Sequence, residues 1–147
     1  MKGQPQLNEN QRANLIDWLQ SIHIKFRLLP ETLFITVNTI DRYLSCVWLN
    51  KDDLQLLGVT ALFIAAKYEE IYPPTLKEFA YITKNACSTK QILAMEQDII
   101  RKLEFQITRT SPYRFLERYK QVAKVSQTVF YLAQYLLELT LLDSKMN

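Results

Sequence analysis

Apolar residues recur every three or four positions along most of the 147-residue chain, which is the spacing of amphipathic helices. The first predicted helix begins near Asn8 and ends before Pro30, because the residue before a proline avoids the helical region. Pro30 can open the second helix, since the first helical position needs no amide donor. Both helices carry an apolar stripe for a core: Leu15, Leu19, Ile22 and Phe26, then Leu33, Val37, Ile40, Leu44 and Val47.

The third predicted helix, at about residues 53–70, differs from its neighbours because almost no polar face interrupts its apolar residues. A helix that is apolar all round is a buried one. Gly58 and several alanines also allow neighbouring helices to approach it closely. We therefore expect this helix to lie at the centre of a bundle, with Asn50 ending the second helix and capping the third.

Residues typical of helix caps predict four further helices. They are the capping boxes Thr75 with Glu78 and Ser88 with Gln91, the pair Ser111 and Pro112, and Ser126. In the last two helices, the residues expected to face inward are Tyr113, Leu116, Tyr119 and Val122 or Ala123, then Val129, Leu132, Leu136 and Leu139. Two helices alone cannot cover such faces.

The predicted fold class is all-α. Only two glycines and five prolines are present, too few for a fold with many tight turns, and no strand pattern competes. We predict that residues 8–105 form a five-helix bundle around the buried third helix. Residues 106–110 then form a connector, and residues 111–147 contribute two more helices.

Catalytic and metal sites are difficult to build from this composition. His23 is the only histidine, and its position between two isoleucines predicts a surface or edge residue. One histidine and no cysteine pair give too few ligands for zinc, and two glycines exclude a glycine-rich phosphate loop. Glu69 and Glu70 point about 100° apart on a helix, so they do not form a catalytic pair. We predict a binding protein, not an enzyme, that uses no metal or cofactor.

Charge and cysteine content limit the partners and the compartment. The net charge is only +3. Five basic residues gather late in the chain, namely Arg109, Arg114, Arg118, Lys120 and Lys124. Because Glu117 interrupts this cluster, we interpret it as a solvated helix face. Two scattered cysteines indicate reduced thiols, no apolar stretch reaches the roughly 20 residues of a membrane helix, and the N-terminus lacks a signal peptide. We expect an intracellular protein of the nucleus or cytoplasm, with no membrane or nucleic-acid partner.

Segments along nearly the whole chain resemble the cyclin family, in the family's order and at similar spacing. They are residues 12–19, 25–33, 40–44, 54–59, 66–74, 95–96, 103–105 and 138–143. The run Ala-Lys-Tyr-Glu-Glu-Ile-Tyr-Pro-Pro at 66–74 is one of them, and the whole set is most similar to mitotic, B-type cyclins. The resemblance implies an N-terminal cyclin box at 8–105 and the first two helices of an incomplete second box at 111–147.

The resemblance also implies a kinase-binding site. Lys67 and Glu96 match residues that hydrogen-bond the kinase backbone beside its mobile regulatory helix. Around them, the residues that match the family's apolar pocket are Ile64, Tyr68, Ile100 and Ile107, with Phe105 in the same region. Without the resemblance, these apolar residues indicate ordinary core packing. Arg12 and Asp41 match a buried structural ion pair.

The implied function is that of a regulatory subunit, which binds and allosterically activates a cyclin-dependent serine/threonine protein kinase in mitotic control. The alternative is a cyclin-fold transcription factor that binds DNA and other initiation factors. Such proteins usually carry a stronger basic face and lack the setting of Lys67 and Glu96. A salt-dependent DNA-binding assay would separate the two hypotheses.

Two departures from the family pattern change these expectations. Many cyclins dock Arg-x-Leu substrates and inhibitors on a patch that begins with Met-Arg-Ala-Ile-Leu, whereas residues 11–15 read Gln-Arg-Ala-Asn-Leu. Leu15, Trp18, Leu54 and Gln55 still match, so we expect a weakened patch. Family members also have two complete boxes, so the chain is interpreted as a fragment or a truncated gene product. Its exposed Leu132, Leu136 and Leu139 should then promote aggregation.

Overall fold

A computed structural model describes residues 8–107 and 109–143 of the chain. Within these ranges the chain forms seven α-helices and one short 3-10 helix, and it has no strand. The elements are α1 (Glu9–Phe26), α2 (Pro30–Cys46), η1 (Lys51–Asp53), α3 (Leu54–Glu69), α4 (Leu76–Ile82), α5 (Thr89–Lys102), α6 (Pro112–Ala123) and α7 (Gln127–Thr140). The predicted all-α class is therefore confirmed.

The predicted helix starts agree with the structure, because their cap side chains form the expected hydrogen bonds. Thr75 and Ser88 each accept from the backbone amide three residues later, and Glu78 and Gln91 complete the two capping boxes. α2 begins at Pro30, as expected. The prediction for Asn50 was wrong: α2 ends at Cys46, and Asn50 precedes η1 without a side-chain cap bond. The three-residue turn of η1 separates Asn50 from α3.

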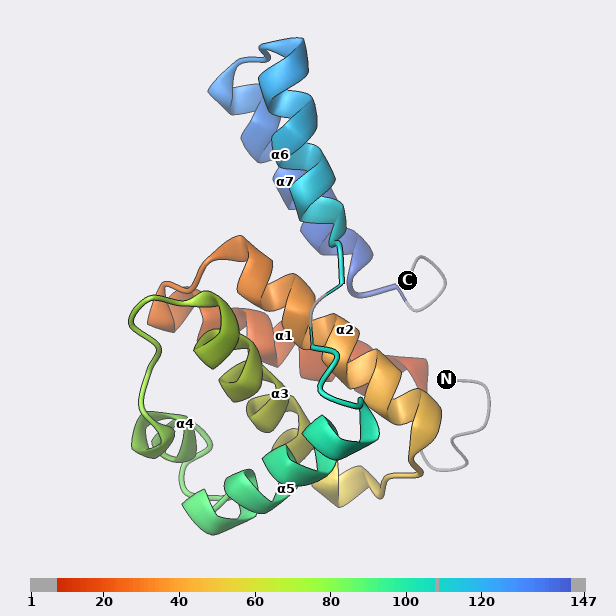
Figure 1. The fold of residues 1–147 in the computed structure, drawn as a ribbon, viewed down its shortest axis with the longest axis vertical. Helices are drawn as coiled ribbons and strands as arrows, with labels where there is room; N and C mark the ends of the chain where they lie inside the picture. The colour runs from red at the N-terminus through yellow and green to blue at the C-terminus, as the bar shows by residue number, and fades with distance from the viewer. Residues whose placement is uncertain (1–7, 108, 144–147) are drawn as a thin grey trace.

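α3 lies in the middle of a body formed by α1 to α5 (Figure 1). From Leu57 to Ala66, every residue of this helix is buried, which confirms the expected central helix. Gly58 permits close contact with α1, because a Cβ atom there would lie 2.7 Å from Leu15 Cδ1. The lone histidine belongs to the same body: His23 is buried, and its Nε2 lies 2.8 Å from the carbonyl oxygen of Leu29. The expected surface position of His23 was therefore wrong.

α6 and α7 form a hairpin that projects from this body (Figure 1). Its base rests on α1 and α2 through a second, smaller core cluster. In this cluster, the ring of Tyr113 stacks on Phe34 with centroids 6.0 Å apart, and Phe130 contacts the other side of Tyr113. The hairpin is thus fixed to the body at one end.

Beyond its base, the hairpin leaves much of its apolar surface exposed. Tyr119 is 65% exposed and Val122 is 71% exposed, so the expectation that they face inward was wrong. The reason is that no element of the described chain packs against this side of α6. The stripe predicted on α7 is exposed as well, at Leu132, Leu136 and Leu139.

Candidate functional site

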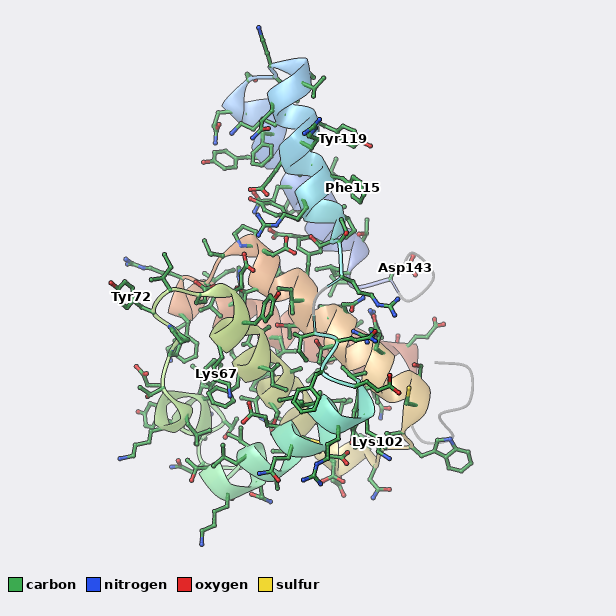
Figure 2. All side chains as sticks on the ribbon, viewed as in Figure 1. Lys67, Tyr72, Lys102, Phe115, Tyr119 and Asp143 are labelled. Atoms are coloured by element: carbon green, nitrogen blue, oxygen red, sulfur yellow. The ribbon has the colours of Figure 1, made fainter. Side chains whose placement is uncertain are left out.

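A charged pair links α3 and α5 at the surface of the body. Lys67 lies in the last turn of α3, and its Nζ donates a hydrogen bond to Oε1 of Glu96 in α5. The Glu96 side chain is only 10% exposed, whereas that of Lys67 is 44% exposed. The Lys67 ammonium also lies 4.3 Å from the ring centroid of Phe63, close enough for a cation–π attraction to the ring face. The pair therefore joins α3 to α5, and the Lys67 side chain, labelled in Figure 2, remains partly exposed to solvent.

The apolar residues expected around this pair divide into buried and exposed ones. Ile64 belongs to the core, one helical turn before Tyr68, which is 55% exposed. Ile100 and Ile107 are half-buried and pack against the main core. Phe105 is 76% exposed. The accessible part of the predicted pocket is therefore formed by Tyr68 and Phe105, with parts of Ile100 and Ile107.

The turn after α5 presents Phe105 to solvent. Glu104 and Phe105 both have positive φ angles, 52° and 60°, a conformation that costs about 1–2 kcal/mol for a residue with a side chain. Backbone hydrogen bonds hold the turn, including Phe105 N to the Ile100 carbonyl at 3.0 Å. A strained turn with an exposed aromatic residue is more typical of a binding surface than of a simple connection.

The other residues that match the cyclin family also lie close together in the structure, in an ion pair and in a pocket. Arg12 is buried, and its Nε and Nη2 atoms each lie 2.7 Å from a carboxylate oxygen of Asp41. Leu15, Trp18, Leu54 and Gln55 line one shallow pocket of about 340 Å³. Gln11 and Asn14, where the chain departs from the family pattern, line the same pocket. The substitutions therefore change the pocket itself.

No helix of the described residues is long and apolar enough to cross a membrane. In the same part of the chain, no cluster of three or more histidine, cysteine or acidic side chains could hold a metal ion.

Comparison with known families accounts for this arrangement. The family model for the cyclin N-terminal domain matches residues 1–108, and that for the cyclin C-terminal domain matches residues 110–147. The chain belongs to the cyclin family. The family predicted from the sequence is thus confirmed, and family membership agrees with a regulatory protein and not an enzyme.

Curated relatives of this cyclin chain are mitotic cyclins. G2/mitotic-specific cyclin-B1 of Oryzias luzonensis is 48% identical over 147 residues, which is 100% of this chain and 36% of the relative. Cyclin-B1-4 of Arabidopsis thaliana is 47% identical over 136 residues, covering 89% of this chain and 35% of the relative. The chain thus spans about a third of the length of these relatives, and their names agree with the B-type similarity expected from the sequence.

A solved structure has the same fold. The X-ray structure of a viral cyclin from herpesvirus saimiri superposes with a TM-score of 0.83 over 98% of this chain and 63% of the viral one. The sequence identity is 19%, so this likeness concerns the cyclin fold alone.

Sequence reasoning missed two features of this cyclin chain. Arg12 Nη1 donates to the carbonyl oxygen of Leu141 at 2.8 Å, so the ion pair of the body also holds the end of the hairpin. After α3, Ile71 and Tyr72 are 84% and 92% exposed, and Figure 2 shows Tyr72 extending from the loop. The available indication of exposure was an aromatic residue directly before Pro73 and Pro74, in the loop that follows the end of α3 at Glu69.

A further missed feature is the role of Arg114. The sequence placed Arg114 on a solvated basic face, and its side chain is 49% exposed, but it also lies beside three carboxylates. Its guanidinium contacts Glu69 at 2.7 Å, Glu117 at 3.1 Å and Glu31 at 3.5 Å. Ser111 donates to Glu31 at 2.7 Å, and burial raises the pKa of Glu31. These residues form a polar contact between the body and the hairpin, which no periodic pattern could predict.

Proposed function

We propose that this cyclin chain binds a cyclin-dependent protein kinase and activates it allosterically in mitotic control. Its partner would then be found in the nucleus or the cytoplasm. The proposal rests on family membership and on one observation, the Lys67–Glu96 pair beside the exposed Tyr68 and Phe105. Residues 8–105 would act as the N-terminal box, and residues 111–147 would be the first two helices of a second box.

The pair suits recognition of a polypeptide backbone. An ammonium carries three donors, and one of those of Lys67 is used by Glu96. The others are available for backbone carbonyls, while the Glu96 carboxylate can accept from backbone amides. Tyr68 and Phe105 offer exposed aromatic surface, the composition that protein interfaces favour. A helix of the kinase with an apolar face would fit such a surface.

The mechanism would be a population shift. In the inactive kinase, the regulatory helix is rotated outward, and its glutamate cannot pair with the lysine that positions the ATP phosphates. A cyclin surface complementary only to the inward helix lowers the free energy of the active state alone. Activation would then require no chemistry from the cyclin chain.

Two single substitutions test this function. Lys67→Ala and Glu96→Ala should each weaken kinase binding at least tenfold, because each removes charge-assisted hydrogen bonds. Lys77→Ala and Glu9→Ala are matched controls, since both residues are exposed and lie outside the proposed surface. Calorimetry with a purified cyclin-dependent kinase gives the affinities, and circular dichroism checks the fold. Kinase activation by both site variants at the level of the controls would reject the proposal.

The substrate-facing pocket is proposed to be weak. Gln11 and Asn14 replace two apolar residues of the family pattern in a pocket that still contains Trp18 and Leu54. The lost apolar burial is worth roughly 1.5–3 kcal/mol for each side chain that a ligand would cover fully. The double substitution Gln11→Met and Asn14→Ile should therefore tighten binding of an Arg-x-Leu peptide by at least tenfold. Tight peptide binding by the unmodified chain would contradict this view.

A further inference from the structure

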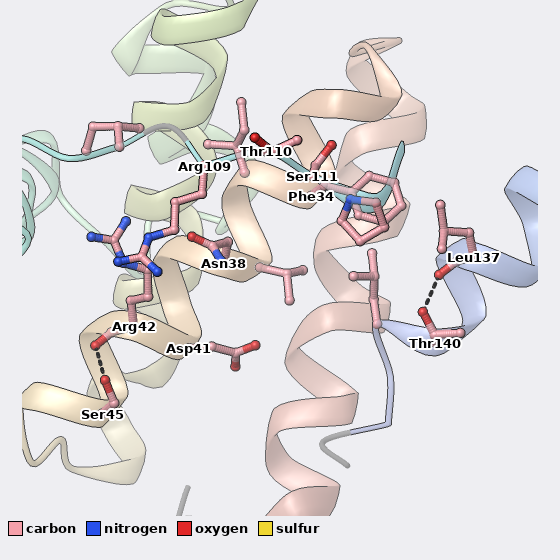
Figure 3. Close-up of a pocket in the computed structure, with 15 residues that line it drawn as sticks. Phe34, Asn38, Asp41, Arg42, Ser45, Arg109, Thr110, Ser111, Leu137 and Thr140 are labelled. Atoms are coloured by element: carbon pink, nitrogen blue, oxygen red, sulfur yellow. Dashed lines mark hydrogen bonds between the residues drawn. The ribbon is translucent and has the colours of Figure 1, made fainter. Parts of the chain in front are cut away.

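A cavity of about 590 Å³ lies where α2, the connector and the end of α7 meet. One wall is apolar and includes Phe34, Val37 and Leu137. The opposite end is basic, and Figure 3 shows the guanidinium groups of Arg42 and Arg109 side by side there. The cavity therefore combines two positive charges with room for an apolar group.

The two arginines come from different segments. Arg42 lies on α2, whereas Arg109 belongs to the connector before α6. The Nη1 of Arg42 donates to the carbonyl oxygen of Gln106, which holds the connector against α2. Arg109 is exposed and has no hydrogen-bond or ion-pair partner within residues 8–107 and 109–143. The fold thus brings together two cations that are distant in sequence.

The positive charge at this end of the cavity is not neutralised by nearby acids. Asp41 lines the cavity, but both of its carboxylate oxygens are bound by Arg12. Glu104 lines the adjoining hollow together with Arg42 and Arg109, but within the described residues it forms no ion pair with either arginine. Burial lowers the pKa of Arg42 most, and the neighbouring charge of Arg109 lowers it further. Two like charges held close without a counter-charge favour binding of an anion.

Polar atoms of α2 add to this end of the cavity. Asn38 and Ser45 lie one helical turn before and after Arg42, and both line the cavity. The Oδ1 atom of Asn38 is buried and has no hydrogen-bond partner in the described chain. A ligand with a hydroxyl or a protonated phosphate oxygen would satisfy it. The site therefore offers donors and an acceptor, and two guanidinium groups suited to bidentate contacts.

We propose that Arg42 and Arg109 form a binding site for an oxyanion, a phosphate or a carboxylate, carried on a molecule whose apolar part rests against Phe34, Val37 and Leu137. This site is separate from the Lys67–Glu96 pair, and it does not depend on kinase binding. It is also separate from the pocket around Trp18, which shares no lining residue with it.

Arg109 provides the cleanest test, because its side chain holds no other part of the described structure. Phenyl phosphate, benzoate and inorganic phosphate are titrated into the chain at constant ionic strength, and backbone amide shifts are followed by NMR. Saturable shifts are expected at residues 38–45 and 109–111. Arg109→Ala should weaken phenyl phosphate binding about tenfold. Arg109→Lys should weaken it by a smaller factor, because lysine keeps the positive charge but lacks the planar guanidinium that can bind an oxyanion through two hydrogen bonds.

Arg118→Ala is the matched control, since Arg118 is exposed on α6 and does not line the cavity. It should bind phenyl phosphate like the unmodified chain. Tighter binding of phenyl phosphate than of benzoate would assign the site to a phosphorylated group, and the reverse order would assign it to a carboxylate. Equal binding by the unmodified chain and Arg109→Ala, or shifts that sodium chloride alone reproduces, would overturn the proposal.

Discussion

The body formed by α1 to α5 and the hairpin of α6 and α7 use similar apolar patterns but bury them to different degrees. In the body, α3 is the central helix, and its residue Leu62 is fully buried. In the hairpin, Leu136 occupies an equally regular stripe and is 54% exposed. Helical periodicity therefore predicts that a helix forms, whereas burial depends on the elements that pack against it.

The contact between the two regions is polar as well as apolar. Arg12 joins Asp41 in the body and Leu141 after the hairpin, and Arg114 joins Glu31 and Glu69 from the hairpin side. Both arginines therefore hold the hairpin at a defined angle on the body. Substitutions at these residues and in the two cores can measure how independent the regions are.

Arg12→Ala should have the largest effect on stability. Arg12 is 2% exposed, and its loss leaves the Asp41 carboxylate and the Leu141 carbonyl without their shared donor. Breaking a buried pair from one side typically costs about 3–5 kcal/mol. Urea denaturation measures the free energy of unfolding. A cost below about 1 kcal/mol would mean that the pair does not link the regions.

Truncating one leucine in each region compares the two directly. Leu62→Ala should lower the free energy of unfolding by about 2–5 kcal/mol, because it opens a cavity in the packed core. Leu136→Ala should change it by less than about 0.5 kcal/mol, because the side chain is already exposed. Equal losses in urea denaturation would show that the stripe of α7 is buried in solution.

The same stripe should control self-association. Replacing Leu132, Leu136 and Leu139 by glutamate removes an exposed apolar surface while leaving the base of the hairpin intact. Size-exclusion chromatography with light scattering should then give a lower average mass than for the unmodified chain. A monomeric, cooperatively melting unmodified chain would contradict the expected aggregation.

Arg114→Ala should have an intermediate effect, about 1–2 kcal/mol, since it leaves the buried Glu31 with Ser111 as its only polar contact. Arg118→Ala, one turn further along α6, should change stability by less than about 0.5 kcal/mol. Hydrogen exchange should locate the effect at the base of α6 and the end of α3, where Glu69 lies. Equal exchange in the two variants would contradict a role of Arg114 in joining the regions.

Sequence reasoning was most successful where a single local pattern determines the outcome. Thr75 and Ser88 predicted helix starts because a cap depends only on residues three positions apart. It failed where contacts beyond the helix decide the outcome: His23 is buried, and its ring lies within hydrogen-bond distance of the Leu29 carbonyl beyond the turn. The contacts of Arg114 connect residues up to 83 positions apart (114 − 31 = 83), a distance no periodic pattern reports.

The candidate site divides in the same way. The family resemblance indicated Lys67 and Glu96 by their sequence setting, and their side chains meet in the structure. It did not indicate that Ile64 is wholly part of the core while Phe105 is exposed on a turn with positive φ angles. The exposure of Phe105 is set by the path of the turn after α5, which short sequence segments do not determine.

The smallest expected effect is a pH dependence at the junction of the two regions. Burial is the largest cause that raises the pKa of Glu31, and Glu69 and Glu117 raise it further, while Ser111 and Arg114 act in the opposite direction. A folded-state pKa above the unfolded value of about 4.3 means that the folded chain binds the proton more tightly. Stability contributed by this group is therefore lost as pH rises from about 4.3 through the folded pKa.

Glu31→Gln removes this titration while keeping an oxygen that can accept from Ser111. In urea denaturation between pH 4 and pH 7, the variant should lack the part of the decline in unfolding free energy that Glu31 causes. This part should be small, because the contacts of Ser111 and Arg114 oppose the effect of burial. Parallel stability profiles for the two proteins would mean that Arg114 and Ser111 compensate burial fully. The effects that raise and lower the pKa of Glu31 at the junction would then cancel one another.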